Sequence, residues 1–262
     1  MTISSVDIPS VDILGAKVDG PTASQAVEII IEQVRNPDKK CRHIVVTGFH
    51  GLWIGHQDEE FLRFLNEAEL FCPDGIAPIW LARLQGGALQ GRVTGAELME
   101  AVLHRCAREG IRSFFYGDSE NTLTALAKWT AERFPGAEMA GSLSPPFRPL
   151  SDDEERAHVD IINASGADIL WVGLGLPKQE RWIARNRLRL RVPVAIGVGA
   201  AFRFSAGLVS RPPRWMGENG LEWVWRLCTE PAKVWRRVFI DGPQFWIVAL
   251  AEVWRKRKSR GV

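Results

Sequence analysis

Four short apolar runs, each bounded by glycine or proline, constrain the fold of this chain more than any other feature of its sequence. They lie at residues 44–47, 113–116, 169–172 and 194–197. A continuous apolar run of this length is typical of a strand buried on both faces, as in a parallel sheet. Longer stretches with helical periodicity separate the runs. The sequence therefore predicts an α/β fold, a Rossmann-like parallel sheet with flanking helices, whose ligands bind at the carboxyl ends of the strands.

Capping residues locate the starts of three of these helices. Thr94 and Ser151 are each followed by a glutamate three residues later, which is the pattern of a capping box. A third helix is predicted to begin after Ser119. The helix that follows Thr94 repeats apolar side chains at helical spacing, so we expect one buried face made of Leu98, Val102 and Cys106.

After about residue 205 the alternation stops and the chain becomes basic and rich in tryptophan. Residues 205–262 hold 11 Lys and Arg against 5 Asp and Glu, whereas residues 1–204 hold 22 against 26. Six of the eleven tryptophans lie in the last 48 residues. The net charge of +2 thus combines an acidic body with a basic tail. We predict a Rossmann-like domain at 1–204 and a helical appendage at 205–262.

Composition excludes several classes of protein. With 46% hydrophobic and 24% charged residues, the chain is neither disordered, collagen-like nor a polytopic membrane protein. Its longest apolar stretch, 245–251, has seven residues, and a membrane-spanning helix needs about twenty. Residues 1–9 lack the pattern of a signal peptide, so nothing predicts export. The cysteines are far apart, and we expect buried, reduced thiols at Cys41, Cys72, Cys106 and Cys228.

Asp74 is a candidate catalytic carboxylate. It lies in Cys72-Pro73-Asp74-Gly75, between an apolar stretch and a helix expected to begin near Ala77. At such a strand-to-helix junction a carboxylate could take a proton from a hydroxyl nucleophile. The alternative is that Pro-Asp-Gly forms only a tight turn.

Two glycine clusters follow the last two predicted strands. Gly173-Leu174-Gly175 leads into Pro177, expected at the first helical position, and glycines with a helix N-terminus can cradle a phosphate. Gly197-Val198-Gly199 is the second cluster. A dinucleotide fingerprint would need glycine where the chain has Lys178 and Phe202, so a NAD site is poorly supported. The alternative for both clusters is close backbone packing.

Other polar residues stand at the ends of predicted strands or the start of a helix. Arg92 precedes the helix that begins at residue 94, so its guanidinium could reach a ligand at the sheet edge. The alternative is a solvated side chain. Thr47 ends the first strand and His50 follows it, although a lone histidine is more often a structural hydrogen-bonding group. The sequence has no D-x-D, H-E-x-x-H or Cys/His cluster, so we expect no dedicated metal site.

The tail has two parts. Arginines interleave with tryptophans over residues 211–237, which suits an anion-binding surface, a nucleic-acid stacking surface or an interfacial membrane helix. Residues 245–254 form an apolar stretch that ends in a basic cluster at 255–260, as expected of a helix on an anionic bilayer. The alternative is a helix packed on the core with a solvated end. The acidic body argues against nucleic acid, and the exposed tryptophans could equally form a homo-oligomer contact.

Together these segments resemble the WecG/TagA/CpsF glycosyltransferases, glycosyltransferase family 26. The resemblance runs from about residue 13 to residue 237. Its motifs are Pro73-Asp74-Gly75, Arg92-Val93-Thr94-Gly95, the segment 172–180, the segment 197–202 and the segment 211–227. It implies a membrane-associating appendage, no cofactor, and inverting, metal-independent transfer of a sugar, as by a hexosyl- or N-acetylhexosaminyltransferase. The donor would be a UDP-sugar and the acceptor a polyprenyl-diphosphate-linked saccharide. The enzyme would act in bacterial surface or exopolysaccharide synthesis, peripherally on the inner face of the cell membrane.

The resemblance also implies roles for individual residues. Asp74 matches the proposed base, with Thr47, Arg92 and Gln179 as polar positions around it. Two departures, Phe49 in place of a common asparagine and Arg203 in place of a common aspartate, put the donor sugar in doubt. They also leave open a non-catalytic, nucleotide-sugar-binding regulatory module of the same fold. The implied substrate-binding positions are Gly173, Gly175, Lys178, Gly199, Arg203, His50, Arg211, Arg214 and Arg226.

Overall fold

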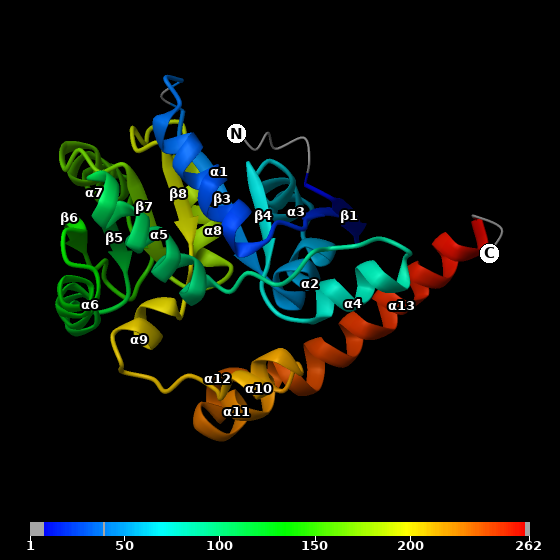
Figure 1. The fold of residues 1–262 in the computed structure, drawn as a ribbon. Helices are drawn as coiled ribbons and strands as arrows, with labels where there is room; N and C mark the ends of the chain where they lie inside the picture. Colours follow the sequence, from blue (N-terminus) through cyan, green and yellow to red (C-terminus); the bar gives the residue numbers. More distant parts are fainter. Residues whose placement is uncertain (1–7, 39, 260–262) are drawn as a thin grey trace.

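The structure of the chain is a computed structural model that describes residues 8–38 and 40–259. A six-stranded parallel sheet forms its centre, and a two-stranded antiparallel hairpin, β1 (Ser10–Ile13) and β2 (Ala16–Asp19), precedes it. The sheet strands are β3 (Arg42–Thr47), β4 (Leu70–Pro73), β5 (Arg112–Gly117), β6 (Glu138–Leu143), β7 (Ile169–Gly173) and β8 (Val194–Gly197). Their order across the sheet is β4-β3-β8-β7-β5-β6, which confirms the predicted α/β fold with a parallel sheet (Figure 1).

Helices cover both faces of this sheet. One face packs against α1 (Ala23–Arg35), α5 (Gly95–Glu109), α6 (Glu120–Arg133) and α9 (Ala201–Ser205). The other face packs against α2 (Phe49–Gln57), α3 (Glu59–Asn66) and α4 (Ala77–Leu84), and towards β5 and β7 against α7 (Asp152–Ala164) and α8 (Lys178–Asn186). Neighbouring residues of one strand therefore enter different cores: Ile44 and Val46 enter one, and Val45 the other.

The predicted strands and helix starts are confirmed. Each of the four apolar runs lies in a buried strand, and the predicted caps precede α5, α6 and α7. Ser151 and Glu154 form a full capping box. The hydroxyl of Thr94 accepts a hydrogen bond from the amide of Glu97. The Glu97 carboxylate, however, accepts from the hydroxyl of Thr94 and not from its backbone amide. The residues expected on the inner face of α5 are buried.

Some elements carry too weak a pattern to be predicted. The hairpin strands have four residues each, and β6 is an edge strand in which no residue is fully buried. Neither shows the continuous apolar run of a central strand. One cysteine prediction is wrong: Cys228 is exposed, because its helix packs without burying any residue fully. The other three cysteines are buried, as expected.

After α9 the chain is helical: α10 (Arg214–Glu218), α11 (Glu222–Thr229), α12 (Pro231–Arg236), the π-helical turn η2 (Arg237–Asp241) and α13 (Gly242–Ser259). Figure 1 shows α13 running beside α4. One face of α13 enters the core under the hairpin, through Phe245, Ala249 and Val253. For this face, the structure therefore shows the alternative of a helix packed on the core.

Polar contacts hold the same helix to the hairpin and to α4. The Glu252 carboxylate accepts the Leu14 amide at 3.1 Å, and Lys256 Nζ lies 2.7 Å from an Asp12 carboxylate oxygen. Arg257 Nε donates to the carbonyl of Leu84 at 2.9 Å. Within the described residues, no helix is long and apolar enough to cross a membrane.

Candidate active site

The candidate base lies where the turns after β3 and β4 meet. The amide of Asp74 donates to the carbonyl of Thr47 at 2.9 Å, which joins the two turns. A Cβ on Gly48 would stand 2.0 Å from the carbonyl oxygen of Asp74, so this approach needs glycine. The Thr47 side chain is buried and faces Gly51 of α2. The structure thus brings Thr47 and Asp74 together, at the sheet edge where ligands were expected.

Arg92 reaches the same edge from the segment before α5. The amide of Val93 donates to the carbonyl of Pro73 at 2.9 Å, which places this segment beside the end of β4. The guanidinium of Arg92 then lies against Gly217 of α10 and 3.9 Å from a carboxylate oxygen of Glu222 on α11. Arg92 is therefore one of the contacts through which the tail helices meet the body beside Asp74.

The carboxyl group of Asp74 sits among opposing charges. Burial raises its pKa to about 7, and Glu222 adds to the rise, while Arg92 and Arg237 oppose it. Glu97 makes a smaller contribution in the same direction. A carboxyl group with a pKa near neutrality can both take and release a proton under physiological conditions, as a general base must.

Arg237 is a site residue that sequence reasoning missed. Burial and the nearby Arg226 lower the pKa of its guanidinium to about 10. The central guanidinium carbon of Arg237, Cζ, lies 6.0 Å from the centre of the Phe49 ring. Among the described residues, the buried Nε atoms of Arg226 and Arg237 have no hydrogen-bond partner. Nη2 of Arg226 lies 3.6 Å from a carboxylate oxygen of Glu230. The two arginines approach each other, and Arg237 lies near Asp74, which is an arrangement suited to an anionic ligand.

His50 also lies at this edge. Its Nε2 atom is 3.6 Å from a carboxylate oxygen of Asp241. Burial and Arg237 lower the pKa of the imidazole to about 4, despite the opposing effect of Asp241. His50 is therefore neutral near pH 7, and together with Asp241 it connects α2 to the turn before α13.

The two glycine clusters lie side by side at the ends of β7 and β8. The amide of Gly175 donates to Oε1 of Gln179 at 3.1 Å, and a Cβ on Gly199 would lie 3.4 Å from that same oxygen. Gln179 is only 3% exposed. Pro177, expected as the first helical residue, is instead the N-cap of α8 and follows a cis peptide bond. A backbone cradle exists here, built around the side chain of Gln179.

Arg203 forms a pair that the sequence did not suggest. Its Nε atom donates to Asp118 at 2.7 Å, and this buried aspartate also accepts from the hydroxyl of Thr122 and the amide of Ser119. Asp118 has a φ of +56°, which is uncommon for a residue with a side chain. The pair joins the ends of β5 and β8 across β7.

Comparison with known proteins agrees with this arrangement. The profile of the glycosyl transferase WecG/TagA/CpsF family matches residues 11–259, nearly the whole chain. The chain belongs to the WecG/TagA/CpsF family. It is therefore a glycosyltransferase, as the motifs predicted.

Two curated relatives in this family carry the same name. An N-acetylglucosaminyldiphosphoundecaprenol N-acetyl-beta-D-mannosaminyltransferase from Bacillus spizizenii is 33% identical over 182 residues, covering 70% of this chain and 68% of the relative. The protein of that name from Bacillus subtilis is 28% identical over 204 residues, covering 77% of this chain and 76% of the relative.

Three further predicted site residues of this family member lie in α8 and in the segment from α9 to α10. Arg211 pairs with Glu100 of α5 and donates to the hydroxyl of Ser205 at 3.2 Å. Lys178 is exposed at the start of α8. Arg214 begins α10, and its side chain lies outside the described part of the structure.

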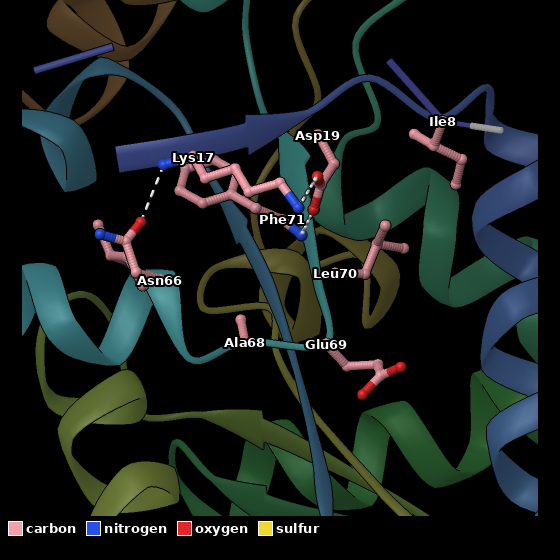
Figure 2. Close-up of a pocket in the computed structure, with 9 residues that line it drawn as sticks. Ile8, Lys17, Asp19, Asn66, Ala68, Glu69, Leu70 and Phe71 are labelled. Carbon is pink, nitrogen blue, oxygen red and sulfur yellow. Dashed lines mark hydrogen bonds and ion pairs between the residues drawn. The ribbon is translucent and has the colours of Figure 1, made fainter. Parts of the chain in front are cut away.

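A cavity of about 160 Å³ lies at the other end of β4, away from Asp74. Figure 2 shows its lining residues, among them Lys17, Asp19 and Asn66. Asp19 accepts the amide of Phe71 at 2.9 Å, so its carboxylate holds the hairpin to the sheet. This cavity is remote from the glycine clusters and takes no part in the site. Among residues 8–38 and 40–259, no three His, Cys, Asp or Glu side chains form a group that could hold a metal ion.

Proposed function

We propose that the protein is an inverting glycosyltransferase that moves a sugar from a UDP-sugar to a polyprenyl-diphosphate-linked saccharide. The observation that carries this proposal is the Asp74 carboxyl group, whose pKa is raised to about 7 and which lies near Arg92 and Arg237, the two arginines that lower this pKa. The glycine clusters lie at the same edge of the sheet. A base, cations and a backbone cradle are what such a transfer requires.

The reaction is one displacement at the anomeric carbon. Asp74 takes the proton of the acceptor hydroxyl as that oxygen forms its bond to the anomeric carbon. The bond from this carbon to the UDP oxygen breaks, and UDP leaves with the electron pair. Arg226 and Arg237, whose Nε atoms have no partner among the described residues, would neutralise the departing diphosphate. Attack from the face opposite the leaving group inverts the configuration.

The acceptor class follows from the relatives. Their names describe transfer of N-acetylmannosamine to an undecaprenyl-diphosphate-linked N-acetylglucosamine. We propose an acceptor of the same chemistry, with its lipid in the membrane. The donor sugar is less constrained, because Arg203, paired with Asp118, places a cation beside the glycine clusters.

Release of UDP tests this function. Purified protein is incubated with a panel of UDP-sugars and a short-chain polyprenyl-diphosphate saccharide, and UDP is measured. We expect acceptor-dependent UDP release by the wild type, and a loss of at least about 10²-fold in Asp74→Asn with UDP affinity little changed, because a general base contributes about 10²–10⁴-fold. Asp160→Asn on exposed α7 is the matched control. Full activity of Asp74→Asn would exclude Asp74 as the base, whereas UDP binding without release by the wild type would favour the regulatory module.

We further propose that the protein binds the cytoplasmic face of the cell membrane through one face of α4 and α13. On α13, Ile247, Leu250 and Trp254 lie at helical spacing opposite the packed face and are 70%, 47% and 64% exposed. Trp80 of α4 continues this face, since its ring lies 6.2 Å from that of Trp246. The exposed cations around it are Arg83, Arg255, Arg257 and Lys258; Arg260 lies outside the described residues.

Apolar groups ringed by cations suit an anionic lipid surface. The double variant Ile247→Ser/Trp254→Ser should bind vesicles of mixed anionic and neutral lipid at least about tenfold more weakly, because about 25 cal/mol per Å² of apolar burial is lost. Leu188→Ser is the matched control, since Leu188 is 93% exposed in the turn after α8, away from α4 and α13. Unchanged vesicle binding would reject the membrane role. A shift in gel-filtration mass instead would assign this face to a second copy of the chain.

A further inference from the structure

Glu180 is a buried carboxyl group that the mechanism above does not use. It lies in the first turn of α8, is 0% exposed, and its Oε1 accepts a hydrogen bond from Nε2 of Gln179 at 2.8 Å. Its other oxygen, Oε2, has no hydrogen-bond partner among the described residues. Burial raises the pKa of the group to about 7. Placing a carboxyl group here costs solvation, and the hydrogen bond from Gln179 is the side-chain contact among the described residues that offsets part of that cost.

The contact of Glu180 determines which way the Gln179 amide points. An amide has a donating nitrogen at one end and an accepting oxygen at the other. Because Glu180 offers an oxygen, the nitrogen of Gln179 must face it. The amide oxygen is then left to accept the amide of Gly175, as observed at 3.1 Å. The reversed amide would set oxygen against oxygen at Glu180 and nitrogen against nitrogen at Gly175.

Gln179 in turn separates the two glycine clusters. A Cβ on Gly197 would lie 2.8 Å from the Gln179 nitrogen and 3.0 Å from Oε1 of Glu180. A Cβ on Gly199 would lie 3.4 Å from the Gln179 oxygen and 3.9 Å from Cα of Gly175. Both turns are thus shaped around one side chain, and that side chain is oriented by one carboxyl group.

We propose that Glu180 is a positioning residue for the donor site: by fixing the orientation of Gln179, it sets the spacing of the two glycine turns that receive UDP. This inference rests on the proposed function, because it takes these turns to be the UDP site. The inference requires UDP affinity to depend on whether the side chain at residue 180 is long enough to contact Gln179, and not on whether that side chain is charged.

Two single variants separate reach from charge. Glu180→Asp keeps the charge but is one carbon shorter, which takes its carboxylate out of hydrogen-bond range of Gln179. Glu180→Gln keeps the reach and an accepting oxygen but removes the charge. In UDP titrations by calorimetry, we expect Glu180→Asp to bind UDP about tenfold more weakly than the wild type, which is the loss expected for one hydrogen bond. The affinity of Glu180→Gln should stay within about threefold of the wild type. Glu132→Asp, on exposed α6, is the control.

An exchange of the two side chains provides a test that does not depend on the shorter variant folding. Gln179→Glu removes the donor that faces Glu180 and should weaken UDP binding about tenfold. In the double variant Gln179→Glu/Glu180→Gln the new amide donates to the new carboxylate, which still accepts from Gly175, so UDP should bind at least about threefold more tightly than to Gln179→Glu alone, while the carboxylate at residue 179 keeps the affinity below that of the wild type.

The outcomes separate the inference from the proposed function. Equal UDP affinity in all variants, tighter binding by Glu180→Asp than by Glu180→Gln, or no recovery in the exchanged pair would each overturn the positioning role while the transferase assignment stands. Absence of UDP binding by the wild type would overturn both. Thermal unfolding of each variant confirms that the titrated protein is folded.

Discussion

At the scale of single residues, the chemistry of this site depends on how far burial shifts an ordinary carboxyl group. An isolated aspartate has a pKa near 3.8 and is a weak base at neutral pH. Burial and Glu222 bring Asp74 to about 7, whereas Arg92 and Arg237 keep the rise from going further. The side chains that adjust the base come from the body and from the tail.

This environment predicts a pH dependence of transfer. Asp74 accepts a proton only when ionised, so kcat/KM should be half-maximal near pH 7, level off above it and fall tenfold per pH unit well below it. Glu222 raises the pKa of Asp74, so Glu222→Gln should move this acidic limb to lower pH. The measurement is kcat/KM from pH 5 to 9 for both proteins. An acidic limb that stays in place, or moves upward, would contradict the assignment.

At the scale of elements, glycines allow the segments of the site to approach one another. Gly48 lets the turn after β3 lie on the backbone of Asp74, and Gly217 lets α10 lie on the guanidinium of Arg92. The two contacts differ in kind. The first is backbone against backbone, and the second is backbone against the end of a flexible side chain.

Alanine at these positions should therefore have different effects. Gly48→Ala places a methyl group 2.0 Å from a carbonyl oxygen and should reduce the free energy of unfolding by about 2–4 kcal/mol. In Gly217→Ala the new Cβ would lie 2.9 Å from Nη2 of Arg92, so the flexible Arg92 side chain moves aside. The free energy of unfolding should stay within about 1 kcal/mol of the wild type, while the rate of UDP release falls about tenfold. Gly91→Ala, with no atom within 4 Å, is the control. Thermal unfolding and UDP release check all three, and a stable Gly48→Ala protein would refute the distinction.

At the scale of the whole molecule, α13 has one packed face and one exposed apolar face. Its inner face completes the core around the hairpin, α2 and α4, whereas its outer face exposes the apolar side chains assigned above to the membrane. A sequence can show that this helix is apolar and basic. Only the fold shows that removing it would damage the body as well as the tail.

Deletion of residues 243–262 should therefore destabilise the protein and not merely release it from lipid. Loss of Phe245, Ala249 and Val253 from the core should lower the free energy of unfolding by at least about 3 kcal/mol, since removal of one large core side chain costs about 2–5 kcal/mol. Thermal or urea unfolding of the truncated chain measures this. A midpoint equal to that of the full chain would show that α13 contributes nothing to the core, and only then would truncation be a clean test of membrane binding.

The sequence by itself determined the sheet class, the four central strands, the helix caps and the family motifs. These signals are local: a strand buried on both faces must be continuously apolar, and a cap acts within three residues of itself. The edge strand β6 and the hairpin lack such a signal, because neither is buried on both sides. The segments after the strands that carry Asp74, Gln179 and Gly199 could be located from the same local patterns.

Only the tertiary structure decided which polar groups meet. Arg237 and Glu222 reach Asp74 from the tail, and Glu180 and Asp118 are buried behind the glycine turns. In sequence each is an ordinary charged residue on a helix or in a turn. The charge state of a buried group depends on every charge folded around it, and those neighbours are set by contacts between segments far apart in the chain.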